Sequence, residues 1–306
     1  RMWVTGLTDT IRISLVDLNL VGNQWVKPKR SDATVDTTYS ISVVSIEENP
    51  QIYQSPVGGD ILRQTVINQN SANTKSNESS LSIDVRNLST NGERKYARKD
   101  YGSAPLDLFN YKRMKLFVNG DPTFNYTNEQ IYDAAMVVRF GTDSNNYYEY
   151  RAPVHPDVRP GQPWNAQNEV TINFADLTAI KLARDSSGIS QAYPVPNGPP
   201  GSYYIIKGNP ALNIIREIVL GVEKNRSSLN TSLTGSTWFN EIRLLKVNDD
   251  NGYAYNFSAG LKLSDLMLMN LNYANVDPNF HPIDGRIGSR SINQNWDLSA
   301  TFNAHK

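Results

Sequence analysis

The feature that most constrains this chain is the alternation of apolar and polar side chains between Tyr111 and Arg151. A period of two places one set of side chains against a core and the other toward solvent, which is typical of a half-buried antiparallel strand. The Gly-Thr-Asp-Ser-Asn-Asn run at 141–146 suits a hairpin connection. We therefore predict an all-β fold, an antiparallel β-sandwich. The apolar positions of the two clearest strands are Met114, Leu116 and Val118, then Met136, Val138 and Phe140.

Further runs with this period extend the prediction to about eight strands between residues 81 and 247, for which a jelly-roll-like sandwich is the most economical fold. Ala175–Arg184 is the best helix candidate, and the Pro/Gly-rich run Tyr193–Gly201 cannot be a central strand. The expected core comprises Met114, Leu116, Val118, Met136, Val138, Phe140, Ile172, Phe174, Leu220, Ile242 and Leu244.

The sequence on either side of the predicted sandwich divides the rest of the chain into segments of different character. Residues 1–50 hold two strand candidates, Ile11–Leu20 and Tyr39–Ile46. Two strands alone are not a stable unit, so we interpret them as the closing strands of a preceding β unit. Residues 51–80, interrupted by prolines and glycines, are predicted to be a linker. Residues 81–250 form the predicted sandwich and residues 251–306 a different kind of β segment.

Composition narrows the class of protein. The 30 basic and 30 acidic residues cancel, so no global field favours nucleic acid as a partner. The mixed charge run Glu93–Asp100 is interpreted as a solvated loop or strand face, with an acidic partner as the alternative. The absence of cysteine excludes disulfides, thiolate metal sites and cysteine nucleophiles. No apolar run is long enough for a transmembrane helix, and we expect the chain to be an internal fragment of a longer protein.

The C-terminal segment, 253–306, alternates differently from the sandwich. Tyr253–Leu263, Leu266–Ala274 and Trp296–Lys306 are each close to ten residues long, with apolar side chains on one face and aromatic residues toward their ends. This pattern is typical of outer-membrane β-barrel strands that contact lipid. A plain antiparallel sheet facing a core gives the same pattern, so that alternative stays open. Ser264-Asp265 is predicted to be a two-residue turn and Val276–Asn293 a long loop.

No motif indicates catalysis, a metal or a cofactor. Asn248–Gly252 could be a calcium loop, but Asn-Gly between alternating strands favours a hairpin turn. His155, His281 and His305 lie in separate loops without metal-ligand spacing. We expect no enzyme activity. The carboxylates available for glycoside cleavage, the weakest hypothesis, are Asp143, Glu149, Glu217 and Glu241.

An aromatic cluster supports an alternative function. Tyr147, Tyr148, Tyr150 and Trp164, with Trp238, could form a ligand surface on which sugar rings stack. Core or cross-strand packing explains the same residues. Alternation places Tyr148 and Tyr150 on one face and Tyr147 on the other, so only part of the set could be exposed. The alternative to a structural role is therefore a carbohydrate-binding jelly-roll module of a cell-surface protein.

Long irregular strings carry a family resemblance. At Glu93–Tyr111, Val138–Asn168 and Trp238–Tyr255, and in the tail strings VDPNFHPIDGRIGSRS and NWDLSATF, the chain resembles the SprA/Sov family of Bacteroidetes gliding-motility and secretion proteins. The resemblance spans nearly the whole chain, although members of that family are far longer. It implies an internal fragment of the outer-membrane translocon of the type IX secretion system, a very large β-barrel with soluble domains inserted between its strands.

The same resemblance implies partners and a location. The partners are secreted cargo proteins that cross in the folded state, a plug protein and a peptidyl-prolyl isomerase-like subunit. The family offers no catalytic residues. With residues 253–306 in outer-membrane lipid, the sandwich is expected on the extracellular side, as part of the wall and cap of a secretion pore needed for gliding motility.

Overall fold

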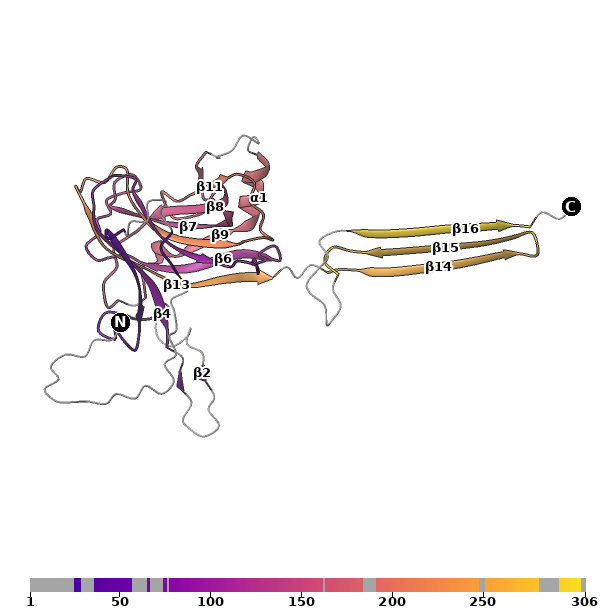
Figure 1. The fold of residues 1–306 in the computed structure, drawn as a ribbon, viewed down its shortest axis with the longest axis horizontal. Coiled ribbons are helices and arrows are strands. Elements are labelled where there is room, and N and C mark those ends of the chain that lie inside the picture. Colours follow the sequence, from indigo (N-terminus) through magenta and orange to yellow (C-terminus); the bar gives the residue numbers. More distant parts are fainter. Residues whose placement is uncertain are drawn as a thin grey trace, which may run out of the picture.

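The computed structural model describes residues 25–28, 36–56, 65–66, 74–75, 77–161, 163–183, 191–247, 251–280 and 292–303. The predicted strand Ile11–Leu20 and most of the Asn248–Gly252 turn lie outside these ranges. Within them the chain is an all-β protein of antiparallel sheets, with a sandwich followed by a separate three-stranded sheet (Figure 1). No helix in these ranges is long and apolar enough to cross a membrane.

One layer of the sandwich is a five-stranded sheet. Its central strand, β13, is fifteen residues long and is hydrogen-bonded to β4 on one side and β6 on the other. A register shift between Asn240 and Arg243 marks a bulge, where Glu241 takes a positive φ of 47°. In spatial order the strands are β1 (Tyr39–Ser45), β4 (Ser79–Leu88), β13 (Leu233–Val247), β6 (Tyr111–Asn119) and β9 (Val170–Asn173).

The other layer is a six-stranded sheet. The hairpin of β7 and β8 forms its centre, and the predicted turn at 141–146 connects these two strands. In spatial order the strands are β10 (Tyr193–Pro194), β11 (Tyr203–Lys207), β8 (Asn146–Pro153), β7 (Ala134–Asp143), β12 (Glu217–Lys224) and β5 (Arg94–Asp100).

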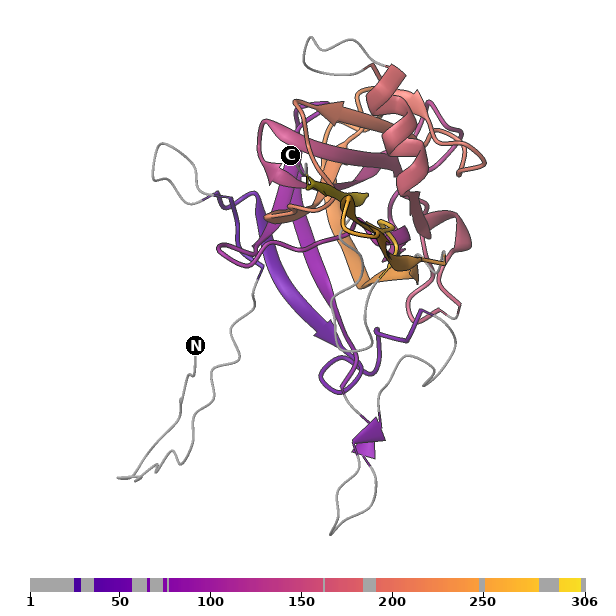
Figure 2. The same ribbon diagram turned by 90° about the vertical axis from the view of Figure 1, so that its right-hand side faces the viewer.

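Shorter elements complete the sandwich. The helix α1 (Phe174–Ala183) confirms the helix predicted from the sequence, and it contacts β6 of one sheet and β11 of the other along one edge (Figure 2). Phe174 and Leu177 face the core, whereas Leu182 is exposed. The 3-10 helix η2 (Ala166–Asn168) precedes β9, and β2 (Thr65–Val66) pairs with β3 (Thr74–Lys75).

The core lies between the two sheets. All the residues predicted to be buried are buried except Ile242 and Leu244, which are half-buried. Ile242 lies in the bulge of β13 and Leu244 directly after it, where the register against β6 changes. Deep in the core the Phe140 ring packs against the rings of Tyr148 and Phe174, with centroid distances of 5.5 and 6.2 Å. The alternation in the sequence therefore identified the inward face correctly.

The structure differs from the sequence prediction at the start of the sandwich. Tyr39–Ser45, predicted to be a closing strand of a preceding unit, pairs with β4 along its whole length as the edge strand β1. The adjoining segment, predicted to be linker, packs on the outer face of the same sheet. There the Tyr53 ring is buried against Trp164 and Trp238. The Tyr53 hydroxyl donates to Glu78 Oε1 at 3.1 Å. The sandwich therefore includes residues well before Leu81.

The charge run Glu93–Asp100, predicted to be a solvated loop or strand face, forms the edge strand β5. The C-terminal sheet consists of β14 (Ala254–Leu263), β15 (Met267–Val276) and β16 (Asn293–Phe302), in that spatial order. All three strands predicted in this segment are thus confirmed, within a few residues at each end.

Candidate functional site

The three-stranded sheet has two chemically different faces because its strands pair in register. β15 pairs with β14 on one side and β16 on the other, and each ladder is ten residue pairs long without a bulge. Residues that share a row therefore share a face. The rows of the apolar face are Phe257, Tyr273 and Trp296; Ala259, Leu271 and Leu298; Leu261, Met269 and Ala300; and Leu263, Met267 and Phe302.

The opposite face carries amide and hydroxyl side chains with few charges. Between the two ends of the described sheet, this face has one large apolar side chain, Leu268. The residues of this face are Asn256, Ser258, Gly260 and Lys262 on β14, Leu268, Asn270, Asn272 and Ala274 on β15, and Asn295, Asp297, Ser299 and Thr301 on β16.

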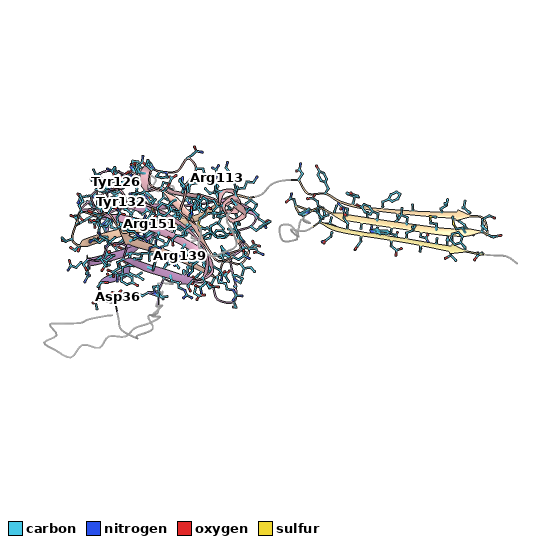
Figure 3. The ribbon with its side chains drawn as sticks, turned by 90° about the horizontal axis from the view of Figure 1, so that it is seen from above. Asp36, Arg113, Tyr126, Tyr132, Arg139 and Arg151 are labelled. Atoms are coloured by element: carbon cyan, nitrogen blue, oxygen red, sulfur yellow. The ribbon has the colours of Figure 1, made fainter. Side chains whose placement is uncertain are left out.

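The apolar face is not covered by any other described part of the chain. Trp296 is 74% exposed, and Phe257 and Leu298 are each more than half exposed. Figure 3 shows side chains standing off both sides of this sheet. Soluble proteins rarely expose contiguous apolar surface across several strands, and such a patch marks contact with protein or lipid. The apolar face of this sheet is therefore suited to contact a protein or lipid surface that is not part of the described chain.

The dimensions of this face match a bilayer. Each of the three strands has ten residues. At a rise of about 3.4 Å per residue such a strand is long enough to cross the hydrocarbon layer, in which tilted spanning strands have roughly 9–11 residues. Aromatic side chains gather at one end, where the rings of Tyr255 and Tyr273 lie 5.9 Å apart beside Trp296. Phe302 lies at the other end. Aromatic girdles at both interfaces are a property of outer-membrane strands.

The outer edges of the sheet also carry information. In the described ranges, β14 and β16 each pair only with β15, so the outward N–H and C=O groups of both edge strands have no ladder partner. Unpaired backbone groups are costly in hydrocarbon, and spanning sheets there have no open edges. In a membrane this sheet requires further strands on both sides.

The aromatic residues proposed for sugar stacking do not share an exposed face. Tyr148 and Tyr150 are buried between the sheets, where the Tyr148 hydroxyl donates to the Pro210 carbonyl oxygen at 2.9 Å. Trp164 is buried on the opposite sheet, with Tyr53 and Trp238. Tyr147 alone is partly exposed, and it lies over the guanidinium of Arg139 at 3.9 Å. A sugar-stacking site would therefore rest on Tyr147.

An ion-pair cluster on the outer face of the six-stranded sheet escaped the sequence prediction. Glu149 and Glu223 are each 1% exposed and lie among three arginines, of which Arg139 and Arg151 are labelled in Figure 3. Arg139 Nη2 lies 2.7 Å from Glu149 Oε2, and Arg151 Nη2 lies 2.6 Å from Glu223 Oε1. Arg94 pairs with both carboxylates. The sequence feature that could have revealed this cluster is the spacing of Arg139, Glu149 and Arg151, which places them on one face of the β7–β8 hairpin.

These pairs dominate the electrostatics of that face. Burial by itself lowers the pKa of Arg151, but the neighbouring carboxylate of Glu223 outweighs it, so the pKa of Arg151 is raised. The pKa of Arg94 is raised in the same way, chiefly by Glu149. Both arginines are therefore charged at any ordinary pH, and the cluster is an ion-pair network.

The other carboxylates named for glycoside cleavage are spread over different elements. Burial raises the pKa of Glu217, whose carboxylate lies 3.1 Å from Arg98. Asp143 accepts from the backbone of Asn145 in the hairpin turn. Glu241 pairs with Arg243 at the bulge in β13.

One of the three histidines, His155, lies in the described part of the chain. His155 packs against the ring of Tyr126, with centroids 3.8 Å apart, and burial lowers its pKa. His281 and His305 lie outside the described residues. No group of three or more acidic or histidine side chains suited to a metal ion occurs within the described ranges.

Comparison with known proteins identifies the family. The model of the SprA_N family, described as motility related/secretion protein, matches residues 1–306. The chain belongs to this family of motility-related and secretion proteins. The sequence resemblance to SprA/Sov proteins is thereby confirmed.

Two other comparisons add little about this chain. No curated protein matches it. One solved structure with some likeness is described as an exo-beta-agarase, with 11% sequence identity and a TM-score of 0.31. The likeness covers 75% of this chain and 26% of the agarase chain, so this chain spans about a quarter of that protein.

Proposed function

We propose that this chain forms part of the wall and the extracellular cap of an outer-membrane protein-secretion pore. In this proposal β14, β15 and β16 are lipid-facing wall strands, and the sandwich is a soluble domain connected to them. The observation that carries the proposal is the exposed apolar face of the three-stranded sheet, with its opposite polar face. Membership of a motility and secretion family supports it.

The finer assignment follows the family resemblance. The pore is that of the type IX secretion system, it exports folded cargo, and it serves gliding motility. The cargo, a plug protein and a peptidyl-prolyl isomerase-like subunit are its partners. The role is structural rather than enzymatic. The polar face of the sheet, rich in asparagine and serine, suits a water-filled interior, since barrel strands alternate between lipid and lumen.

The orientation follows from the connections. Leu263 to Leu266 form a tight turn, closed by the Leu266 N–H donating to the Leu263 carbonyl oxygen at 3.0 Å. A much longer connection joins β15 to β16 at the end of the sheet where β14 begins. Outer-membrane barrels have short periplasmic turns and longer extracellular loops. On this rule the Ser264 turn is periplasmic, and the sandwich, which ends just before β14, is extracellular.

The lipid-facing assignment is tested with two adjacent positions at the same depth. Leu271 and Asn272 lie in the middle of β15 on opposite faces. Each is replaced by cysteine in the full-length protein, labelled with an environment-sensitive fluorophore, and reconstituted with lipids that carry a quencher on their acyl chains. We expect strong quenching for Leu271→Cys and weak quenching for Asn272→Cys. Equal quenching at both positions would reject the wall assignment.

The orientation is tested separately in intact cells. Ser144 in the β7–β8 turn and Asp265 in the β14–β15 turn are both exposed, and the chain has no native cysteine. Ser144→Cys is expected to react with a membrane-impermeant maleimide, and Asp265→Cys only after the outer membrane is permeabilised. The reverse pattern would invert the orientation and leave the lipid-facing assignment intact.

A further inference from the structure

The sandwich contains a cavity that the pore function does not use. It has a volume of about 470 Å³ and lies between the two sheets near their edge strands β1 and β5, beside Trp25, whose neighbour Val26 bridges to Arg98 on β5. The bulge in β13 contributes to it, because Ile242 and Leu244 beside the bulge line the cavity and are only half-buried.

The inner part of the cavity is aliphatic. Leu108, Met114 and Leu220 line it and are at most 1% exposed. The outer part is more open, since Val43 on β1 also lines the cavity and is 44% exposed. An aliphatic wall in a space that is open at one end favours an apolar chain over water along that wall, because an apolar surface offers water too few hydrogen-bond partners. Its volume falls in the range of roughly 300–1,000 Å³ that small-molecule sites occupy.

A single lysine sets the polarity of the opening. Lys99 lies on β5 opposite Ile218, so its side chain points between the sheets, and its ammonium lies 5.3 Å from the centroid of the Tyr101 ring. No carboxylate in the described part of the chain lies within ion-pair distance of this ammonium. Glu241, the carboxylate that lines the cavity, is held by Arg243 with an Nη2–Oε2 distance of 2.5 Å. Among the described residues, the opening therefore keeps one positive charge without an ion-pair partner.

We propose that this cavity binds a single aliphatic chain that ends in a carboxylate, with the chain among Leu108, Met114 and Leu220 and the carboxylate on Lys99. Lysine at the rim of an apolar pocket gains a charge-assisted hydrogen bond from such a head group. The volume suits one medium-length chain rather than a lipid with two chains. The ligand is thus a free fatty acid, and not the surface of a bilayer.

The binding site is tested by photo-crosslinking, because a fatty acid also partitions into lipid and only a mapped adduct reports this cavity. The full-length protein in zwitterionic nanodiscs is exposed to an aliphatic carboxylate that carries a diazirine on its chain, irradiated, digested and analysed by mass spectrometry. We expect adducts on the peptides of β6 and β12 that carry Met114 and Leu220. Excess dodecanoate should remove them, and excess dodecanol should compete less well.

Two variants and one control make the test specific. Lys99→Gln should reduce the adducts about tenfold, the loss expected for one charge-assisted hydrogen bond. Val43→Trp should block the opening without altering the deep core, since Val43 is already partly exposed. Lys115→Gln is the matched control, because Lys115 pairs with Glu169 at 2.8 Å and does not line the cavity. It should leave the adducts unchanged.

The outcomes against the proposal are equally distinct. Absence of adducts on these peptides in the wild-type protein would overturn it. Adducts that Lys99→Gln leaves intact, or that dodecanol removes as well as dodecanoate does, would show that the carboxylate is not recognised. Adducts confined to β14–β16 would show that the probe only follows the lipid.

Discussion

The sandwich strand β6 and the C-terminal strand β14 carry the same alternation of side chains but differ in what covers their apolar face. In β6, Met114 and Leu116 are at most 1% exposed beneath the second sheet. In β14, Phe257 and Leu261 are about half exposed, at 55% and 49%. A period of two specifies that a strand has two faces. It does not specify whether protein, lipid or another subunit covers the apolar one.

The polar faces of the two regions differ as well. The outer face of the six-stranded sheet carries arginines and glutamates that bury each other in ion pairs. The polar face of the three-stranded sheet is dominated by asparagine, serine and threonine. Buried ion pairs fix side chains in place, whereas amides and hydroxyls stay compatible with water along a channel. The two regions are therefore suited to different surroundings on both of their faces.

The largest expected effect is on the unfolding free energy of the sandwich, when a side chain of its buried core is removed. Phe140→Ala should cost about 3–5 kcal/mol of unfolding free energy, because it leaves a cavity between Tyr148 and Phe174. The matched change Phe257→Ala removes an exposed ring and should leave the unfolding of the sandwich unchanged. Urea unfolding of the solubilised chain, followed by tryptophan fluorescence, measures both. A loss below about 1 kcal/mol for Phe140→Ala would mean that the core is poorly packed.

The next effect tests the lipid side. Leu298→Arg lies in the middle row of the apolar face, and in a membrane it should cost about 2–4 kcal/mol of folding free energy. Ser299→Arg is adjacent but on the polar face, so its cost should be small. Folding of the full-length protein into lipid vesicles at a series of urea concentrations gives both values. If the two variants behave alike, the sheet does not present one face to lipid.

A smaller effect is expected from the ion-pair cluster. Arg151→Met leaves Glu223 buried with Arg94 as its remaining partner, so it should cost about 1–3 kcal/mol, the range for a hydrogen bond to a charged group. Lys115→Met is the comparison, because its contact with Glu169 is partly exposed on both sides and should contribute about 0–1 kcal/mol. Chemical unfolding of the two variants separates these cases. Equal losses would indicate that burial adds nothing to the Arg151 contact.

The smallest effect is a pH dependence in the sandwich. Burial lowers the pKa of His155 below its ordinary value of 6.5, so the folded state holds this imidazole neutral. Its contribution to stability is complete above pH 6.5 and declines as the pH falls through the interval between the unfolded and folded pKa values. His155→Gln should flatten this part of the profile of unfolding midpoint against pH. A wild-type profile with no decline between pH 7 and 5 would contradict it.

Much of the fold could be predicted from local sequence. The alternation of Met136, Val138 and Phe140 needs no knowledge of distant residues, and the same holds for the three C-terminal strands. For the segment of β5 the sequence left a loop and a strand face open, because its inward positions include Lys95 and Lys99 and give no apolar period. It is stabilised by Glu149 and Glu223, which lie far away in the sequence.

In the candidate site, too, some features could be predicted from local sequence and others depend on distant residues. The two faces of β14–β16 followed from the sequence, as did their length. The burial of Tyr53, by contrast, depends on Glu78 and Asn240. The Tyr53 hydroxyl donates to Glu78 Oε1, and Asn240 on β13 donates to the same oxygen at 2.7 Å. The aromatic residues predicted to form a ligand surface do not share an exposed face for a related reason. Trp164 has its ring partners on the segments around Tyr53 and Trp238. Long-range partners of this kind leave no periodic trace in the sequence.

The position of β13 has a mechanical consequence. It is the strand that continues toward β14, and it is also the central strand of its sheet, with hydrogen-bonded ladders to β4 and β6 on its two sides. Tension applied along the chain between the two regions would load both ladders in shear. Many hydrogen bonds would then have to break together rather than one after another, as they do when an edge strand is peeled away. The sandwich is thus attached to the three-stranded sheet by a connection that resists pulling along the chain.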